Sequence, residues 1–475
     1  MQILLVNPPS EAPSPVMPLG LAYLAAALDA AGIGVTVVDA WAEGLTLEAL
    51  AEKVARRPPD FTAVTMTSPA YASAMRTIDR IRSCSTAPII VGGPHPSALP
   101  EQCLQDNPNI DFVVIGEGEA TLLELVTALA GGEDLKSIRG IAYRHQGKML
   151  RTGPRERVEN LDRLPFPAYH LFPLNRYRTH PPYGKKNPYL TLVTSRGCPY
   201  RCAYCAKSVF GPAFRAMSPA RVVAQIRHMI DAYHVKEIHF YDDDFTLDMK
   251  RAEQICDLLM RAGVDISWSC TTRVDLVDEN LLRKMKASGC WLISYGVESA
   301  DPDILKNIRK GYTLDKVLGA FDLTRRMGIR TVAYLMAGLP GETPATLKQT
   351  IRFSKKLDPD FVSWGITALY PGSSLYEEAS RGKLGQMDLR YTYQDRSWHA
   401  SGSPYGDGYA IICPGALSRD ELKKYVRRAN IDFYLRPSYL IGFICKIRSF
   451  YEWVHFARGG LKFLFWVMKT RVSNG

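Results

Sequence analysis

The sequence predicts an α/β protein in which an N-terminal doubly wound parallel sheet is followed by a partial barrel of six β/α units and a helical C-terminal extension. Three observations lead to this prediction. Short apolar runs alternate with helical stretches through most of the 475 residues, which is typical of parallel sheets with crossover helices. The first runs are apolar throughout, as in strands that are buried on both faces. Glycines and polar residues gather where the runs end, at the edge where open α/β sheets bind ligands.

The composition is that of a folded protein with an unevenly placed basic charge. Hydrophobic residues make up 46% and charged residues 23% of the chain, which excludes a mainly disordered or collagen-like protein. The net charge is +11, but the segment from Glu421 to Gly475 alone contains 11 basic and three acidic residues. Ten cysteines are too few for a disulfide scaffold. We find no signal peptide and no run of 18 apolar residues, so a reduced, cytoplasmic protein is expected.

The first domain is predicted to span residues 1–135. Its strand candidates are Ile3–Val6, Val35–Asp39, Phe61–Met66, Ile89–Gly92 and Asp111–Ile115. The helix candidates Leu19–Ala31 and Ala120–Ala130 are each followed by a glycine that suits a C-cap. Small or polar residues follow the strands, and five of them are expected to contact a ligand: Ser68, Gly92, Gly93, Glu117 and Gly118. No GxGxxG motif follows the first strand, which argues against a dinucleotide.

Three cysteines with the spacing Cys-x3-Cys-x2-Cys follow directly on the apolar run that begins at Thr191. They are Cys198, Cys202 and Cys205. Three thiolates on one tight loop can each bind one iron of a [4Fe–4S] cluster and leave the fourth iron open to another ligand. Structural zinc would need a fourth protein ligand, usually from a second CxxC or HxxxH pair, and we see none nearby. His239, five residues after His234, sits inside a strand pattern and is expected to be structural.

This motif resembles that of the radical S-adenosylmethionine (SAM) superfamily, which has an aromatic residue just before the third cysteine. Tyr204 fills that place. Further motifs in the order of that superfamily begin at Tyr241 (YDDDF), Thr271 (TTRVD), Gly296 (GVES), Met336 (MAGLPGE) and Ala368 (ALYPGSSLY). The resemblance covers residues 190–380, within a predicted barrel domain of residues 186–405 that follows a linker of residues 136–185.

The residue pattern independently favours a partial barrel. Six strand candidates lie near residues 191–196, 237–243, 267–273, 291–297, 330–337 and 361–369. They alternate with helix candidates near residues 218–233, 250–262, 278–288, 314–327 and 344–357. Six parallel strands with crossover helices form a partial (β/α)6 barrel, whose chemistry takes place at the carboxyl ends of the strands. Each motif named above lies at such an end.

The resemblance implies how SAM is held. Its amino and carboxylate groups chelate the open iron, and reduction of the cluster cleaves the sulfonium to give a 5′-deoxyadenosyl radical. Glu298 is expected to accept hydrogen bonds from the ribose hydroxyls, with a structural pair to Arg273 as the alternative. Asp242, Asp243 and Asp244 are expected to orient the SAM ammonium or the substrate, and one of the three is expected only to cap the next helix. Arg273 would meet the SAM carboxylate, and Gly338 would let the backbone approach the adenosyl group.

The first domain, placed ahead of such a barrel, resembles the cobalamin-binding class of this superfamily. Its GGPHPSALP segment from Gly92 and its GEGE segment from Gly116 resemble the branch that contains the anaerobic magnesium-protoporphyrin ester cyclase and many methyltransferases. Cobalamin-dependent mutases and methionine synthase carry Asp-x-His-x-x-Gly after the first strand, whereas residues 7–17 contain no histidine here. Either cobalt is bound without a protein histidine or the domain is a relic. His95 is a further option as a ligand, against a purely structural role.

The resemblance implies three cofactors, a [4Fe–4S] cluster, SAM and cobalamin, and leaves three functions open. The first is cobalamin-dependent methylation of an unactivated carbon on a lipophilic or secondary-metabolite small molecule, in which one SAM supplies the methyl group through cobalamin and a second supplies the radical. The second is an oxidative cyclase or oxidoreductase with the same parts. The third is a non-catalytic cobalamin or cluster sensor, against which the intact SAM motifs argue. An enzyme of this kind needs a reductant such as flavodoxin or ferredoxin.

The C-terminal extension, residues 406–475, is predicted to be helical, basic and aromatic. In residues 435–471 single basic residues are interleaved with aromatic and aliphatic ones, and a glycine pair at 459–460 divides the segment. Such helices suit peripheral contact with a membrane, and a helical pair packed on the barrel is the alternative. Nucleic acid is not expected, because the aromatics form apolar clusters. Side chains between residues 380 and 412 are candidates to cover the barrel mouth: Tyr391, Tyr393, Trp398 and His399.

Overall fold

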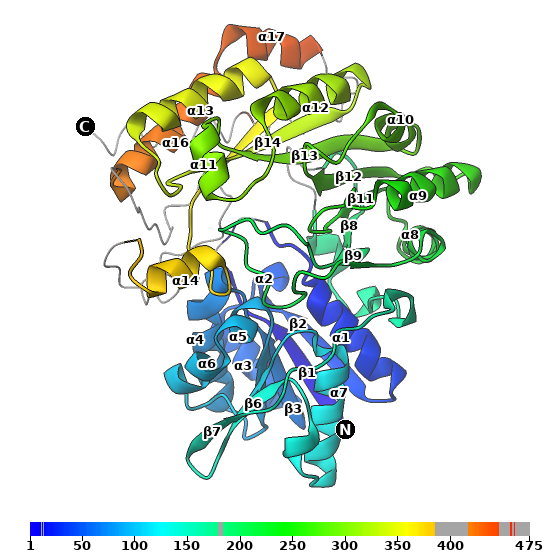
Figure 1. The fold of residues 1–475 in the computed structure, drawn as a ribbon. Coiled ribbons are helices and arrows are strands. Elements are labelled where there is room, and N and C mark those ends of the chain that lie inside the picture. The colour runs from blue at the N-terminus through cyan, green and yellow to red at the C-terminus, as the bar shows by residue number, and fades with distance from the viewer. Residues whose placement is uncertain are drawn as a thin grey trace.

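The computed structural model describes residues 1–384, except for residues 11, 13 and 179–183, and residues 417–445 together with 457 and 460. Figure 1 shows two α/β domains stacked on one another, the first in blue to cyan and the second in green to yellow. Helix α14 (Ser374–Ser380) lies beside the junction between them. The four residues named as covers of the barrel mouth lie outside the described residues.

The first domain contains the predicted doubly wound sheet. Its parallel strands are β1 (Gln2–Asn7), β2 (Gly34–Asp39), β3 (Phe61–Thr65), β4 (Ile89–Gly92) and β5 (Phe112–Val114). The helices between them are α1 (Leu19–Ala30), α2 (Ala40–Glu43), α3 (Leu47–Arg56), α4 (Tyr71–Arg82), α5 (Pro94–Ala98), α6 (Pro100–Asp106) and α7 (Gly118–Gly131). The spatial order β2-β1-β3-β4-β5 places the topological switch point between β1 and β3, where sheets of this type bind ligands.

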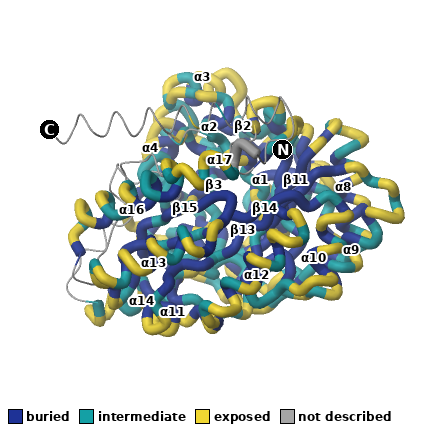
Figure 2. The backbone as a smooth tube through the Cα atoms, turned by 90° about the horizontal axis from the view of Figure 1, so that it is seen from above, coloured by how far each residue is buried: buried dark blue, intermediate teal, exposed yellow. Residues whose placement is uncertain are grey.

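Helices cover both faces of this sheet, as the uniformly apolar strands predicted. Alternate side chains of β1 belong to different cores: Leu5 packs with residues of α1 and α7, whereas Leu4 and Val6 pack with residues of α3, α4 and α6. Figure 2 shows the result as buried strands surrounded by helices with exposed outer faces. Burial on both faces fixes the strand ends, and therefore the edge at which a ligand can approach.

The sheet is wider than the sequence predicted. Strands β6 (Ile141–His145) and β7 (Lys148–Arg151) form a hairpin that extends it in antiparallel sense beyond β5. The turn residues Gln146 and Gly147 both have positive φ, as a two-residue hairpin loop of type I′ requires. The assignment of residues 136–151 to the linker is therefore wrong, and we propose that the first domain extends to Arg151.

The second domain is a six-stranded, all-parallel sheet, as predicted. In spatial order its strands are β15 (Phe361–Ile366), β14 (Arg330–Ala337), β13 (Cys290–Glu298), β12 (Ser267–Thr272), β11 (Glu237–Phe240) and β8 (Tyr189–Leu192). The connecting helices are α8 (Pro219–Tyr233), α9 (Met249–Arg261), α10 (Glu279–Ala287), α11 (Pro302–Asn307), α12 (Leu314–Arg326) and α13 (Pro344–Leu357). Residue Asp248 caps α9, so the expectation that one of the three preceding aspartates does so is wrong.

Some polar side chains on the inner face of this partial barrel are only half-buried. Side chains that face the helices, such as Trp268, Ile293 and Trp364, are buried. Thr271 and Ser363, on the opposite face, are only half-buried. The interior of a complete (β/α)8 barrel is filled by layers of side chains. This open barrel instead leaves polar side chains available inside it.

The described part of the C-terminal extension packs on the barrel. It consists of α16 (Arg419–Tyr434) and α17 (Pro437–Cys445). Phe433 is fully buried, the Tyr434 hydroxyl donates to the carbonyl of Val362 at 2.8 Å, and Arg436 pairs with Asp358. The packing alternative is therefore confirmed for residues 417–439. Within the described parts of the chain, no helix combines the length and apolarity needed to cross a membrane.

Candidate functional site

The three motif cysteines lie on a loop that a short ribbon closes at its base. Strands β9 (Ser195–Arg196) and β10 (Arg215–Ala216) pair antiparallel, and the chain between them carries Cys198, Cys202 and Cys205. Lys207 donates to the Cys198 carbonyl at 2.7 Å, within the loop. Burial raises the thiol pKa of Cys198, and burial followed by the nearby Asp243 raises that of Cys205 to about 11. The thiols of Cys198 and Cys205 are therefore protonated before a metal binds, and metal binding releases their protons.

This cysteine arrangement suits a cluster better than a single ion. No group of three or more His, Cys, Asp or Glu side chains within the described ranges is placed to hold one metal ion. A [4Fe–4S] cluster does not need such a group, because each cysteine binds a different iron and the thiols stay apart. Three cysteines on one loop thus fit a cluster with one open iron, as the spacing indicated.

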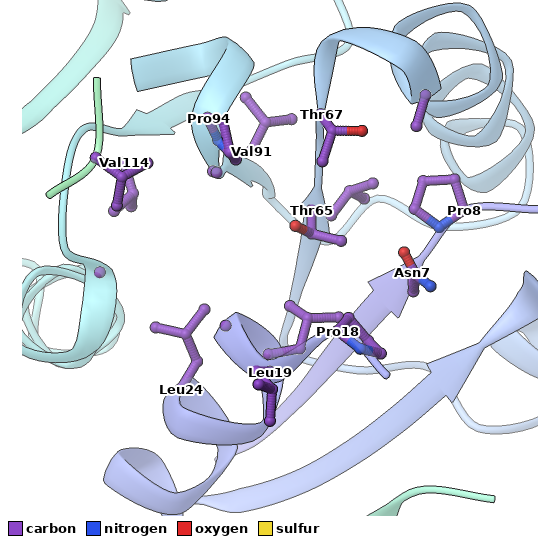
Figure 3. Close-up of a pocket in the computed structure, with 18 of the residues that line it drawn as sticks. Asn7, Pro8, Pro18, Leu19, Leu24, Thr65, Thr67, Val91, Pro94 and Val114 are labelled. Atoms are coloured by element: carbon purple, nitrogen blue, oxygen red, sulfur yellow. The ribbon is translucent and has the colours of Figure 1, made fainter. Parts of the chain in front are cut away.

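A cavity of about 1250 Å³ lies between the cysteine loop and the first domain. Figure 3 shows side chains from several elements converging on it, among them Asn7 at the end of β1, Thr65 at the end of β3, Thr67 just after β3, and Val91 in β4. The opposite wall includes Cys198, Cys205, Tyr241 and Asp243. The predicted ligand edge of the first sheet and the predicted cluster loop of the second therefore face the same space.

Four of the five residues predicted at the edge of the first sheet line this cavity: Gly92, Gly93, Glu117 and Gly118. Gly93 has φ +106°, and a Cβ atom there would lie 2.9 Å from the Met66 carbonyl oxygen, so only glycine fits. Ser68 does not line the cavity; its hydroxyl lies 2.9 Å from Nδ1 of His95, behind the wall. His95 is completely buried, and burial lowers its pKa to about 4. The structure thus gives both residues an internal role rather than the predicted ligand contact.

Asp242 holds the chain that enters the cysteine loop. Its carboxylate accepts hydrogen bonds from the backbone and hydroxyl of Thr194, both at 2.5 Å, and from the Ser195 backbone at 3.2 Å. Both of its oxygens accept hydrogen bonds from the chain, so Asp242 fixes the entry to the cysteine loop, and its contact with SAM stays a prediction. Its neighbour Asp243 is exposed and lines the cavity. Alternation along the chain explains why neighbouring aspartates face opposite sides.

Asp244 and Arg273 each retain a buried polar atom without a hydrogen-bond partner. Asp244 accepts the Thr272 hydroxyl at 2.6 Å through Oδ1, while Oδ2 has no partner, and burial raises its pKa to about 6. Arg273 forms a fork with Asp275 at 2.9 Å through two nitrogens, while Nη1 has none. Buried polar atoms are normally satisfied. One anionic and one cationic atom left open beside the cysteine loop fit the ammonium and carboxylate of SAM.

Glu298 pairs with Lys310 and not with Arg273, so the predicted alternative for Glu298 is wrong. Lys310 Nζ lies 2.8 Å from Glu298 Oε1 and 2.9 Å from the Tyr204 hydroxyl, which itself donates to Oε1 at 2.8 Å. Burial alone would lower the Lys310 pKa, but Glu298 together with Tyr312, Tyr204 and Cys202 outweighs burial, so the pKa is raised. Two of these three contacts end on Oε1, and none of the described residues hydrogen-bonds Oε2. Oε2 therefore fits the predicted ribose contact.

Gly338 lies against the C-terminal extension. Its φ is +81°, and a Cβ atom would lie 2.9 Å from Leu422 of α16. The space beside this glycine, where a Cβ atom would lie, is thus filled by the C-terminal extension. Its amide donates to Glu342 Oε2 at 2.5 Å, which ties the two ends of the MAGLPGE turn together.

The carboxyl of Glu342 is expected to make stability fall as the pH rises. Burial raises its pKa from 4.5 to about 7, so the unfolded chain loses this proton at a lower pH than the folded chain. The contribution is fully present below pH 4.5 and is lost as the pH rises to about 7, a change of about 3 kcal/mol. Urea unfolding at pH 4.5 and 7.5 measures this contribution. The difference in the free energy of unfolding between the two pH values should be smaller in Glu342→Gln than in the wild type. An equal difference in both proteins would contradict the role of Glu342 in this pH dependence.

Lys310 and Tyr241 were not selected from the sequence as site residues, and Asp243 was named only as one of three neighbouring aspartates. Lys310 carries no motif signal, because its role depends on a fold-dependent contact with Glu298. Tyr241 begins the YDDDF motif and is 51% exposed although it ends an interior strand, because its ring faces the cavity. A signal for Asp243 was present in the aspartate run, but the run does not show which carboxylate faces the ligand.

Comparison with known proteins agrees with this geometry. The model of the "Radical SAM superfamily" matches residues 192–354, and that of the "B12 binding domain" matches residues 10–126. The chain is 35% identical to the "Uncharacterized methyltransferase PH0819" of Pyrococcus horikoshii, over 94% of this chain and 96% of that protein. It is 29% identical to the anaerobic magnesium-protoporphyrin IX monomethyl ester cyclase of Rubrivivax gelatinosus, over 89% and 74%.

Among solved structures, the cobalamin-dependent SAM radical enzyme OxsB, with aqua-cobalamin and SAM bound, is similar in fold. Its TM-score is 0.73 at 19% identity, and the match covers 98% of this chain and 71% of OxsB. The full-length relationship to the Pyrococcus protein overturns the sensor alternative. The chain belongs to the enzymes of the radical SAM superfamily that carry a B12-binding domain, whose cofactors are a [4Fe–4S] cluster, SAM and cobalamin.

Proposed function

We propose that the enzyme methylates an unactivated carbon of a lipophilic small molecule. The shared cavity is the observation that carries this proposal, because it is lined on one side by the edge of the B12-type sheet and on the other by Cys198 and Cys205. A methyl donor and a radical source that open into one space can act on the same substrate carbon. When bound, the cluster with SAM supplies a 5′-deoxyadenosyl radical and cobalamin supplies the methyl group.

In this proposal the barrel residues hold and orient SAM. Cys198, Cys202 and Cys205 hold the cluster, and Tyr204 steadies Glu298 for the ribose hydroxyls. The open atoms of Asp244 and Arg273 receive the ammonium and the carboxylate of SAM. Charge-assisted hydrogen bonds of this kind are about twice as strong as neutral ones, so they fix the orientation of the bound molecule.

The first domain provides a flat, small-residue edge for cobalamin. Gly92, Gly93 and Gly118 allow a large planar ligand to approach the backbone. No histidine is found among the described residues that line the cavity, and His95 is buried behind it. We propose that cobalt is bound here without a histidine from the protein.

An aromatic side chain in the cavity wall and the name of one relative support a lipophilic substrate. Tyr241 presents a half-exposed aromatic ring beside the cysteine loop, next to Val193. By its name, the Rubrivivax relative acts on a porphyrin ester, which is a large, mainly apolar molecule. That relationship also keeps oxidative cyclisation as the second candidate function. In both cases we propose a reduced flavodoxin or ferredoxin as the electron donor.

One assay separates the two functions. The protein is reconstituted anaerobically with iron, sulfide and cobalamin, reduced, and incubated with SAM. Methyl transfer predicts both S-adenosylhomocysteine and 5′-deoxyadenosine, whereas the cyclase alternative predicts 5′-deoxyadenosine alone. Cobalamin-free protein is the matched control and should lose only S-adenosylhomocysteine. Equal S-adenosylhomocysteine with and without cobalamin would contradict methyl transfer through cobalamin.

We further propose that residues 446–475 bind an anionic membrane surface. This segment contains six basic residues and one acidic residue among seven aromatics. Each basic residue near such a surface contributes about 1 kcal/mol. Deletion of residues 446–475 is expected to lower co-sedimentation with phosphatidylserine vesicles at least tenfold and to preserve the fold, because α16 and the Arg436 pair remain. Equal partitioning of the two proteins would refute the membrane contact.

A further inference from the structure

Two arginines stand side by side at the base of the cysteine loop. Arg196 in β9 and Arg215 in β10 are paired residues of the short ribbon that closes this loop. All three motif cysteines lie between them in the chain. The position of these two arginines therefore sets where the cysteine loop leaves the barrel.

Both arginines bind the GEGE segment of the first domain. Arg215 donates to the Glu117 carboxylate through two guanidinium nitrogens, from Nη1 to Oε2 at 3.1 Å and from Nη2 to Oε1 at 2.5 Å. Arg196 reaches Glu119 at 2.5 Å and Glu117 at 3.5 Å. Glu117 also accepts the amide of Val158 at 2.9 Å, so its carboxylate is occupied by protein groups and is not free for the predicted cofactor contact. We call these four side chains the arginine–glutamate clamp: Arg196, Arg215, Glu117 and Glu119.

The clamp is largely buried. Each of its four side chains is at most 10% exposed, and the Arg196 guanidinium lies 5.3 Å from the Tyr23 ring centre and 5.1 Å from that of Phe210. Buried charges are costly unless they are paired. Removing one partner therefore leaves an uncompensated buried charge and destabilises the contact between the two domains. Glu117 and Glu119 also border the cavity at the edge of the B12-type sheet. The clamp thus joins the wall of one predicted cofactor site directly to the base of the other.

We propose that the arginine–glutamate clamp is a positioning device that fixes the cysteine loop relative to the cobalamin edge, so that methyl transfer across the domain boundary is possible. The expected effect of the clamp on methyl transfer rests on the proposed function. Its expected effect on the position of the cysteine loop does not. Reductive cleavage of SAM takes place within the barrel and does not depend on the distance to cobalamin. Methyl transfer between SAM and cobalamin crosses the boundary and is sensitive to displacements of about 1 Å.

Hydrogen exchange of the cofactor-free protein tests the structural part. Glu119→Gln removes one charge of the clamp, and Glu124→Gln is the matched control, because Glu124 pairs with Arg155 on the exposed side of the same helix α7. Peptides that cover residues 195–217 are expected to exchange at least tenfold faster in Glu119→Gln than in the wild type, and at the wild-type rate in Glu124→Gln. Unchanged exchange in Glu119→Gln would overturn the clamp, whatever reaction the enzyme catalyses.

The ratio of the two SAM products tests the catalytic part. In the reconstituted protein, Glu119→Gln is expected to form 5′-deoxyadenosine within twofold of the wild type and S-adenosylhomocysteine about tenfold more slowly. Arg196→Lys, which keeps the charge but loses the planar fork, should shift the ratio in the same direction. Parallel loss of both products in both variants would overturn positioning in favour of a merely structural role. Absence of S-adenosylhomocysteine from the wild type would instead refute the proposed function and leave the exchange result standing.

Discussion

Replacement of Cys198 by alanine is expected to abolish the formation of 5′-deoxyadenosine completely. Cys198 lies at the cavity wall, and its loop offers three thiols, so the loss of one leaves two ligands for a cluster that needs three. The measurement is iron content together with 5′-deoxyadenosine after anaerobic reconstitution and reduction. We expect both to fall, because the cluster no longer assembles stably.

Cys256→Ala is the matched control for this loss. Cys256 is completely buried in α9 and lies outside the cysteine loop. Alanine there should reduce stability by about 1 kcal/mol through the lost packing and leave SAM cleavage at the wild-type level. Retained cleavage in Cys198→Ala would show that the cluster is held elsewhere.

Replacement of Lys310 by methionine is expected to lower the free energy of unfolding by about 3–5 kcal/mol, because it leaves the Glu298 carboxylate buried without its cation. Lys310 and Glu298 are 7% and 8% exposed and 2.8 Å apart. Glu298 also has a φ of +63°, a conformation that few side chains adopt, so its surroundings hold it in place. Urea unfolding at pH 7 measures the effect.

Two further variants show whether the unpaired buried charge of Glu298 causes the loss of stability in Lys310→Met. Lys284 bridges Glu253 and Asp257 at 3.1 and 2.8 Å, but these side chains are 23–29% exposed, so Lys284→Met should lose less than about 1 kcal/mol. The double variant Lys310→Met with Glu298→Gln removes the uncompensated charge and should regain much of the lost stability. Equal losses in Lys310→Met and Lys284→Met would contradict the importance of burial.

The fold was largely predictable because its local signals are strong. The strand predicted at Ile89–Gly92 has those bounds, and the helix predicted at residues 344–357 is α13. Uniformly apolar strands between capped helices leave little choice of secondary structure. The β6–β7 hairpin was missed because both strands are short, and because β7, which forms the edge of the sheet, is mostly exposed and carries no strong pattern. Its Gln146-Gly147 turn was the available signal.

The candidate site was only partly predictable because side-chain partners depend on the fold. The spacing of three cysteines indicated their shared loop, and the positions of Gly92 and Gly93 indicated the cavity edge. The partners of Glu117 and Glu298 lie 98 and 12 residues away in the chain, and no local pattern announces them. Likewise, the aspartate run does not reveal that Asp242 accepts hydrogen bonds from Thr194 while Asp243 faces the cavity.

Electron paramagnetic resonance of the reconstituted protein tests most directly whether the two cofactor sites share one cavity. The sample would contain cobalamin in its paramagnetic Co(II) state together with the reduced cluster, and each centre would also be measured alone. The common cavity, lined by Gly92 and Gly93 on one side and by Cys198 and Cys205 on the other, predicts a magnetic interaction that broadens both signals. A spectrum equal to the sum of the two isolated centres would contradict a shared reaction space.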